Sequence, residues 1–387
     1  MSDSPLEPMY GVRPRTFNVL DCSAALPASF CAQLLGAFGG KILRIDDLKF
    51  SNGARTDFKD EFLTGCAIYS AYVQRDKECL ELDLRDRSGR EVLHDRVRTT
   101  DMLIEDRRTN DLATIGLDRT TLFGLNPRLV LVSITPYGRT HSEVQTVASD
   151  LTLYHGGGLG FATPGLVDSP VHDPPLRLGS HQGEFVSGLA AAINASAAVL
   201  RQLRWPDQGP SIVDFSCHKA MANVFRQDLG SFAYYQGGLN RDVQRGRGAG
   251  GTVERRNLRC EDGWVNLSWA GVQQWDSLRQ MLDEPLWMND DRLATPHMRY
   301  RNWSVIWPHL EEWAAAKAKE EIFLICQAHR IPCAPVNSGS ELLKSALLQS
   351  REYWDERDDA RKMPGFVSKW WRVPERTRGE DNAAFSS

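Results

Sequence analysis

Short apolar runs alternate with segments of helical periodicity along the first third of the chain. An apolar run over 17–21 predicts a strand, and apolar positions at helical spacing over 27–40 predict a helix that ends at a glycine pair. A second apolar run over 41–46 predicts the next strand. Strand, helix and strand in this order form a βαβ unit, which must be parallel and right-handed.

The alternation continues beyond this unit. Strands are predicted over 79–84, 102–105 and 129–134. A helix is predicted over 88–97, with a serine as its N-cap and a glutamate three positions later, the spacing of a capping box. The first part of the sequence therefore predicts an open α/β sheet.

The pattern changes in the middle of the chain. Residues 188–200 predict a helix of small side chains, which permits close backbone approach and favours a buried position. A turn, a strand over 211–215 and a helical stretch to about residue 235 follow. Residues 237–257 are rich in glycine and arginine and predict a loop. From Cys260 a hairpin and tryptophan-rich helices predict a second, smaller α+β domain.

Composition narrows the class of protein. The 387 residues include 46 Lys+Arg and 50 Asp+Glu, which gives a net charge of -4 and no electrostatic reason to expect a nucleic-acid partner. No apolar run approaches the roughly 18 residues of a membrane span, and the polar N-terminus lacks the apolar core of a secretory signal. The 8 cysteines include no C-x-x-C pair. We therefore expect a cytoplasmic protein with reduced thiols.

Two glycine clusters stand at 156–160 and 246–251. Neither matches the G-x-G-x-x-G fingerprint of a dinucleotide site, and neither has the Lys-Ser/Thr of a phosphate loop. The first is as compatible with a plain turn as with a ligand site. The second lies beside several arginines, which suits an anionic ligand.

A histidine and a glutamate stand three positions apart at His181 and Glu184. On a helix, both side chains would lie on one face. A metal site needs a further ligand nearby, and none is visible, so we expect no metal. One alternative is an acid–base or nucleophile pair at a helix start, where the free N–H groups keep a carboxylate ionised. Taken alone, the local sequence favours a capping glutamate beside a surface histidine.

Several segments, taken in order, resemble the family III CoA-transferases. This family includes the formyl-CoA:oxalate and carnitine CoA-transferases and the related α-methylacyl-CoA racemases. The resemblance runs from about Asn18 to Val367. Its matching segments are VLD at 19–21, FCAQLLG at 30–36, ILRID at 42–46, DKECLELDL at 76–84, IEDRR at 104–108, LATIGL at 112–117, LNPRLV at 125–130, CEDGW at 260–264 and RIPCAPV at 330–336.

The resemblance implies an α/β fold in which a Rossmann-like large domain carries an inserted smaller α+β domain, in an interlocked dimer. The large domain would be discontinuous, over 1–205 and 336–387, with a linker helix over 206–235 and the small domain over 236–335. The implied reaction moves CoA from an acyl-CoA donor to a carboxylic acid. CoA thioester would be a substrate, with no cofactor bound permanently. The implied protein partner is a second copy or a homologous subunit.

The family nucleophile is an aspartate in a vGDxxxG motif that opens the small-residue helix. When Gly188 is aligned with the last glycine, Glu184 takes that position, and His181 is the neighbouring candidate. Glutamate has the required carboxylate, but its extra methylene displaces the group by about 1 Å, and a misplacement of that size can cost on the order of a hundredfold in rate. The glutamine of the oxalate enzyme's site matches Leu26, and the racemase histidine matches Ser149.

The resemblance also implies residues that bind CoA. Arg55, Lys77 and Arg108 are the candidate phosphate contacts, because the CoA phosphates need cations. Solvated surface charges are the alternative for each. The second glycine cluster lies where a glycine-rich loop covers the intermediate in the transferases. Its candidate residues are Gly248, Gly250 and Gly251, whose N–H groups would stabilise an oxyanion.

Three functions remain open on the sequence. The first is an active CoA-transferase with Glu184 as nucleophile. The second is a noncatalytic subunit that binds CoA esters and pairs with an active homologue. The third is a CoA-ester isomerase or racemase-like enzyme with His181 and Glu184 as acid and base.

Overall fold

The computed structural model describes residues 17–48, 64–107, 109–140, 148–163, 174–235, 257–269, 271–356, 362–365 and 367. The chain divides into two compact units. The first comprises 1–132, 192–213 and 344–387, and the second comprises 133–191 and 214–343. The chain therefore passes between the units four times. The domain boundaries expected from the sequence, after residues 205, 235 and 335, stay predictions.

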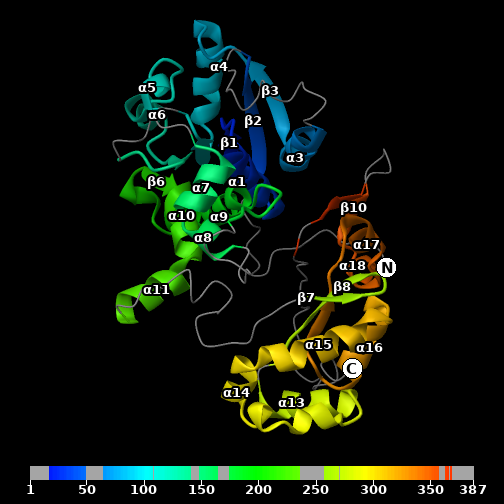
Figure 1. Cartoon of the computed structure of the whole chain (residues 1–387). Helices are drawn as coiled ribbons and strands as arrows, with labels where there is room; N and C mark the ends of the chain where they lie inside the picture. The colour runs from blue at the N-terminus through cyan, green and yellow to red at the C-terminus, as the bar shows by residue number, and fades with distance from the viewer. Residues whose placement is uncertain are drawn as a thin grey trace, which may run out of the picture. The chain divides into compact units, whose positions relative to one another are not determined.

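A six-stranded sheet forms the centre of the first unit, and two of its strands continue into the second (Figure 1, blue to green). Its strand order is β3-β2-β1-β4-β5-β6. β1 runs parallel to both β2 and β4, and β2 runs parallel to β3, so the predicted βαβ unit is confirmed. The strands are β1 Asn18–Asp21, β2 Lys41–Asp47, β3 Glu78–Leu82, β4 Met102–Glu105, β5 Val130–Thr135 and β6 Ser211–Ser216.

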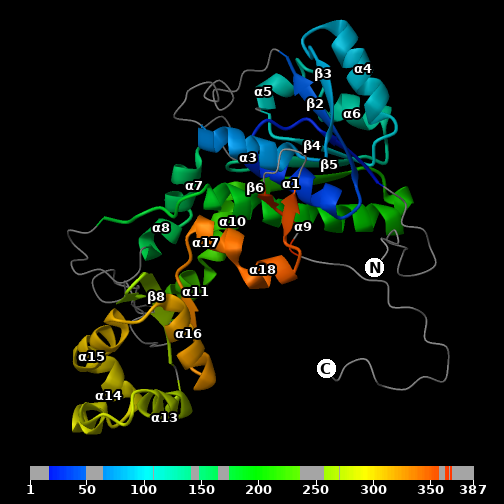
Figure 2. The ribbon, with the colours of Figure 1, turned by 90° about the vertical axis from the view of Figure 1, so that its right-hand side faces the viewer.

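Helices cover both faces of this sheet (Figure 2). α1 (Leu26–Ala37) packs on β1, β2 and β4 and contacts α3 (Thr64–Gln74). On the other face, α4 (Arg87–Val97) and α6 (Arg119–Leu125) bury leucine and valine side chains against every second residue of the strands. The short α5 (Thr109–Leu112) lies between β4 and α6 in the chain. Because side chains alternate along a strand, polar residues of β1 and β2 lie on the α1 face.

The predicted N-cap of α4 is wrong by two residues. Asp86 is the N-cap, and its carboxylate accepts the N–H of Ser88 and the Ser88 hydroxyl proton. Glu91 instead forms an ion pair with Arg87 one turn earlier. An aspartate accepts these N–H groups as well as a serine does, which is why the sequence pattern alone did not separate the two.

Helices of the middle segment follow β5. They are α7 (Asp150–Gly156), α8 (Leu159–Ala162), α9 (Gln182–Arg204), the 3-10 turn η3 (Pro206–Gln208), α10 (Cys217–Val224) and α11 (Arg226–Tyr235). The predicted long helix after β6 is thus two helices. The first glycine cluster is a close-packing feature, because a Cβ on Gly157 would lie 2.2 Å from Met221 Cβ and one on Gly158 would overlap Phe225.

The small-residue helix α9 is only partly buried. Ala191, Ala192, Ala195 and Val199 are buried, as the small side chains predicted. Apolar residues on its other side are exposed, namely Leu189, Ile193, Leu200 and Leu203. Among the described helices, α9 alone is long and apolar enough to cross a membrane, a property it shares with core helices of soluble proteins.

A three-stranded antiparallel sheet and a group of helices make up the α+β part of the second unit. Its strands are β7 Asn257–Cys260, β8 Gly263–Leu267 and β9 Cys333–Pro335, which confirms the predicted hairpin. Its helices are α13 Val272–Met281, η4 Leu286–Asn289, η5 Asp291–Leu293, α14 Pro296–Arg301, α15 Trp303–Ala315, α16 Lys319–Ala328 and α17 Gly339–Lys344. Trp269, Trp275, Trp303 and Trp307 form the centre of its core.

The C-terminal part returns to the first unit with α18 (Ala346–Ser350) and the hairpin β10 (Trp354–Glu356) and β11 (Lys362–Pro364). Arg75, at the end of α3, donates to the carbonyl of Pro364 and lies 3.9 Å from the Asp355 carboxylate.

Across the described part of the chain seven cysteines are free, and five of these are buried, as predicted. Cys79 is exposed.

Candidate functional site

His181 and Glu184 meet at the start of α9. Ser180 and His181 have left-handed backbone angles, with φ of 68° and 54°, so the chain turns sharply before Gln182 begins the helix. The turn places His181 Nδ1 2.7 Å from Glu184 Oε2. The Glu184 side chain is 19% exposed and that of His181 is 35% exposed. The predicted pair is therefore in contact, with its carboxylate in the first helical turn and open to solvent.

Asp150 holds this helix start in place. It lies in the first turn of α7, which Ser149 caps, and its side chain is 2% exposed. Its Oδ1 accepts the backbone N–H of Glu184 at 3.0 Å, and its Oδ2 accepts a hydrogen bond from Arg177 Nη1 at 3.0 Å. A Cβ on Gly183 would lie 2.9 Å from Asp150 Oδ1, so the close approach requires glycine there. One buried carboxylate thus positions the backbone that carries Glu184.

The charges around His181 favour its protonated form. The hydrogen bond to Glu184 is the largest influence and raises the pKa of His181 above its ordinary value. The negative charge of Asp150 acts in the same direction, while partial burial and the positive charge of Arg177 oppose it. A charged imidazolium donates to the carboxylate and fixes one of its oxygens, so the other oxygen is left for chemistry.

The carboxyl ends of β1 and β4 form the second region of interest. The chain moves outward from β1 to β3 and then returns to β4, so the strand order reverses beside β1. Ligands of open α/β sheets bind at such a reversal. Here the loop N–H groups of Ala24 and Ala25 donate to the Asp106 carboxylate at 2.5 to 3.1 Å. Burial raises the pKa of Asp106 to about 6, despite these hydrogen bonds and the nearby Arg107.

Lys77 is buried beneath the same loop. Its Nζ lies 2.8 Å from Asp21 Oδ2 and 2.8 Å from the carbonyl oxygen of Ser29. The side chains of Lys77 and Asp21 are 2% and 0% exposed, and Arg44 lies 3.8 Å from the same Asp21 oxygen. Burial alone would raise the pKa of Asp21, but Lys77 and Arg44 outweigh it and hold that pKa below its ordinary value.

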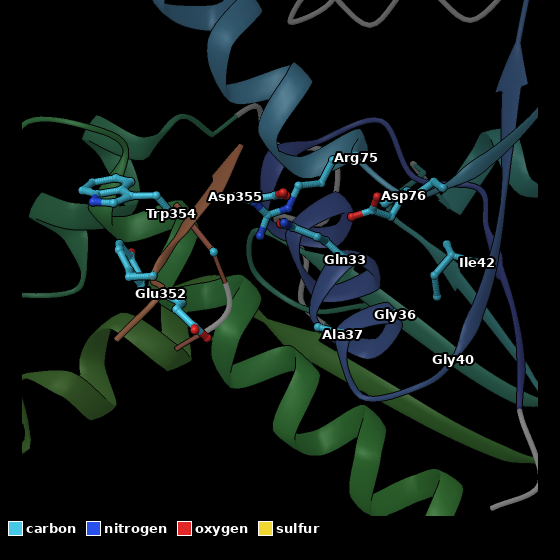
Figure 3. A pocket seen from close by; sticks show the side chains of 13 residues that line it. Gln33, Gly36, Ala37, Gly40, Ile42, Arg75, Asp76, Glu352, Trp354 and Asp355 are labelled. Carbon is cyan, nitrogen blue, oxygen red and sulfur yellow. The ribbon is translucent and has the colours of Figure 1, made fainter. Parts of the chain in front are cut away.

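A cavity of about 560 Å³ lies in the first unit at the amino ends of β2 and β3, where Gly40 and Ile42 lead into β2 (Figure 3). Arg75 and Asp355 line it as a close pair, 3.9 Å apart, and Gln33 on α1 lies beside them. Lys77 lines this cavity and also reaches Asp21, at the carboxyl end of β1.

The remaining sequence candidates are not placed. Arg55, Arg108, Gly248, Gly250 and Gly251 lie outside the described residues. Within the described part of the chain, no group of three His, Cys, Asp or Glu side chains is arranged to hold a metal ion.

Sequence reasoning missed two residues of the His181–Glu184 site. Asp150 directly follows Ser149, the position that matches the racemase histidine, and Arg177 lies in none of the motifs quoted above. The distance in the chain from Asp150 to Glu184 is 34 residues, so only the folded structure reveals their contact.

Three comparisons relate the chain to known proteins. The family model "CoA-transferase family III" matches residues 15–381. A formyl-CoA:oxalate CoA-transferase of Rhodopseudomonas palustris (strain BisA53) is 25% identical over 355 residues, covering 86% of this chain and 81% of that protein. The enzyme of the same name from Escherichia coli O81 (strain ED1a) is 26% identical over 364 residues, covering 89% and 84%.

Solved structures show the same fold. A CAIB/BAIF family protein from Brucella suis has a TM-score of 0.77 at 20% identity, covering 97% of this chain and 94% of its own. Rv3272 from Mycobacterium tuberculosis has a TM-score of 0.75 at 20% identity, covering 96% and 95%. The fold is thus shared along nearly the whole length of each chain.

Proposed function

Because this chain belongs to the family III CoA-transferases, we propose that it moves CoA from an acyl-CoA donor to a carboxylic acid with Glu184 as the nucleophile. One observation carries the proposal: a partly exposed carboxylate stands in the first turn of α9, with its backbone tethered to Asp150 and one oxygen held by His181. The positive end of a long helix favours the ionised, nucleophilic form of a carboxylate at this position.

The donor half of the reaction begins when a Glu184 oxygen attacks the thioester carbonyl carbon. A carbon–oxygen bond forms, the carbon–sulfur bond breaks, and CoA leaves as a thiolate with the electron pair. The thiolate then attacks the glutamyl carbonyl carbon of the mixed anhydride. This step releases the donor acid as a carboxylate and leaves CoA as a thioester on Glu184.

The acceptor half repeats these steps in reverse order. The acceptor carboxylate attacks the glutamyl thioester, and CoA thiolate leaves. The thiolate then attacks the acceptor carbonyl of the second anhydride, which forms the new acyl-CoA and restores the Glu184 carboxylate. No net proton, electron or water is consumed, so the cycle needs no cofactor beyond CoA itself.

The contact with His181 restrains the Glu184 side chain, which is longer than the aspartate it replaces. A flexible carboxylate would lose the alignment that an attack on a carbonyl requires. His181 Nδ1 restrains the Glu184 carboxylate at 2.7 Å, and Asp150 fixes the backbone beneath it. We infer that His181 acts as a positioning residue for the nucleophile.

CoA binding in this proposal depends on the predicted basic residues. Arg55 and Arg108 would contact the phosphates, and the N–H groups of Gly248, Gly250 and Gly251 would receive the oxyanion. Lys77 is the third proposed phosphate contact. Its ammonium already binds Asp21, so direct contact with a phosphate requires Lys77 to exchange that partner.

The relatives suggest where to look for substrates. The two described above are named formyl-CoA:oxalate CoA-transferases, at 25% and 26% identity. We propose a donor and acceptor of this general kind, an acyl-CoA and a free carboxylic acid. Formyl-CoA with oxalate is the first pair to assay, followed by longer acyl-CoAs and acids.

We also propose that the protein works as an interlocked dimer. Support comes from the exposed apolar side of α9, where Leu189, Ile193, Leu200 and Leu203 are each at least half exposed. A run of this kind along one helix is typical of a surface that a second subunit covers. The partner is a second copy of this chain or a homologous subunit, and light scattering and copurification distinguish the two.

Trapping the enzyme thioester tests the proposal. The protein is incubated with formyl-CoA or another acyl-CoA, then treated with hydroxylamine or borohydride, and the modified peptide is located by mass spectrometry. We expect the adduct on Glu184 and none in Glu184→Gln. Glu91→Gln, which removes an exposed glutamate on α4, is the matched control and should behave as wild type. No adduct and no exchange with any donor would refute the transferase.

A second candidate function rests on the same 2.7 Å contact between His181 and Glu184. The two groups are suitable as acid and base in a CoA-ester isomerisation that removes and returns an α-proton. Incubation of an acyl-CoA in heavy water distinguishes this reaction. Deuterium at the α-carbon without a trapped adduct supports the isomerase, and an adduct without exchange supports the transferase.

A further inference from the structure

Arg177 lies beside the nucleophile but has no part in the steps above. Its Nη1 donates to Asp150 Oδ2 at 3.0 Å, and the other oxygen of that carboxylate accepts the Glu184 N–H. A single carboxyl group therefore separates the guanidinium from the start of α9. The pKa of His181 is raised overall, and the positive charge of Arg177 is a smaller, opposing influence on it.

The charge balance of the site creates a need for such a cation. Glu184 is an uncharged thioester when the acceptor acid arrives, so Asp150 and the acceptor are then the two carboxylates at the helix start. Like charges at short range oppose the approach of the acceptor. His181 and Arg177 both lie at the helix start, and of the two only Arg177 offers a planar fork of N–H donors to an incoming carboxylate.

The guanidinium retains binding capacity. Arginine has five N–H donors in a planar fork that matches a carboxylate, and the contacts described for Arg177 use one nitrogen. Its side chain is 36% exposed, whereas its partner Asp150 is 2% exposed. The buried carboxylate thus fixes one edge of the fork, and the rest of the side chain is partly exposed.

We propose that Arg177 binds the carboxylate of the acceptor acid and positions it for attack on the Glu184 thioester. This inference rests on the proposed CoA-transferase function and assigns the acceptor site within it. It predicts that recognition of the acid, but not of the acyl-CoA, depends on the guanidinium. Arginine at such a fork is not interchangeable with lysine, because an ammonium lacks the bidentate geometry.

A neutral acceptor separates acid recognition from the rest of catalysis. Hydroxylamine attacks the Glu184 thioester as an uncharged nucleophile and needs no cation, whereas oxalate and succinate do. In Arg177→Gln we expect the KM for either acid to rise at least tenfold, well beyond any change in the KM for acyl-CoA or in the rate of hydroxamate formation. Arg177→Lys should fall between the two. Arg87→Gln removes an exposed arginine that pairs with a glutamate and is the control.

The results distinguish a failure of the proposed acid site from a failure of the proposed transferase. If wild type forms the adduct and Arg177→Gln leaves the acid KM unchanged, the inference is overturned and the transferase stands. If hydroxamate formation falls together with acid turnover, Arg177 only supports Asp150, and the inference is again overturned. If wild type forms no adduct, the proposed function fails. In that case, succinate binding is measured by NMR. Saturable binding that Arg177→Gln weakens tenfold supports an acid site at Arg177. No binding rejects both the acid site and the transferase.

Discussion

Replacement of Lys77 by methionine should destabilise the protein strongly, because Lys77 is half of a buried ion pair. The ammonium lies 2.8 Å from Asp21 Oδ2 and also donates to the carbonyl of Ser29. Methionine fills a similar volume but leaves the Asp21 carboxylate in the interior without its closest cation. Arg44, at 3.8 Å, is too far away to replace a direct hydrogen bond.

The magnitude follows from burial. The two side chains are 2% and 0% exposed, so solvent does not compensate the carboxylate that remains. Removing one partner of such a pair costs about 3–5 kcal/mol, whereas replacing both by neutral groups of similar size is often close to neutral. We therefore expect Lys77→Met to lower the free energy of unfolding by about 3–5 kcal/mol. The double variant Asp21→Asn with Lys77→Met should recover most of that loss.

Urea unfolding followed by circular dichroism measures both variants. Arg87→Met, which breaks an exposed pair of the same 2.8 Å length, is the matched control and should leave the midpoint unchanged. A loss below about 1 kcal/mol for Lys77→Met would show that the pair is not buried as described. CoA affinity belongs in the same experiment. If Lys77 contacts a phosphate, affinity also falls in the double variant after its stability has recovered.

Three further predictions concern single groups. The pKa of His181, followed by NMR, should lie above its ordinary value and fall in Glu184→Gln. The stability that the His181–Glu184 pair adds to the folded protein is complete below about pH 6.5. It disappears as the pH rises through the folded-state pKa of His181. Asp106→Asn should gain on the order of 2 kcal/mol over wild type above pH 6 and nothing below pH 4, because the raised pKa means that folded wild type loses stability as its carboxyl ionises. Gly183→Ala should lower transferase activity at least tenfold, because its Cβ displaces the Asp150 carboxylate.

Each of these has a result that contradicts it. An unchanged histidine pKa in the glutamine variant would mean that the carboxylate contact does not persist in solution. A stability difference for Asp106→Asn that is constant from pH 4 to pH 8 would locate its effect outside the titration of that carboxyl. Gly230→Ala is the control for the glycine variant, since a Cβ there meets nothing within 4 Å and alanine should stabilise the helix by up to about 1 kcal/mol.

Local patterns were sufficient to predict the sheet. The strand over 102–105 was predicted to the residue, and the strands at 18–21, 41–47 and 211–216 were found within one or two residues of their predicted ends. Each of these strands contains a short run of apolar side chains; the run is buried on both faces in β4, whereas β2 and β6 also carry polar or exposed positions. The cap of α4 was misassigned because Asp86 and Ser88 satisfy the same local rule.

Local sequence patterns pointed to only two of the four residues that meet at the start of α9. His181 and Glu184 are three residues apart, and the sequence placed them on one face only if both were helical; they meet because His181 lies in the left-handed turn before α9. Asp150 and Arg177 come to the site through the packing of α7 against neighbouring segments, and no periodicity reports such a contact. Gly183 illustrates the limit well: in sequence it is one more small residue in a glycine-rich segment, and in the structure it is the position where a side chain would meet the Asp150 carboxylate.

The hydrogen bonds at the carboxyl ends of β1 and β4 limit where the sheet could bind a CoA phosphate. In dinucleotide-binding folds, N–H groups at the first strand–helix turn receive a phosphate. Here the N–H groups of Ala24 and Ala25 already serve the Asp106 carboxylate, and a phosphate placed there would meet a negative charge that is itself hydrogen-bonded. If CoA binds as proposed, we expect its phosphates to contact cationic side chains rather than that turn while Asp106 is ionised. Arg108, two residues after Asp106 in the sequence, is the candidate for that contact.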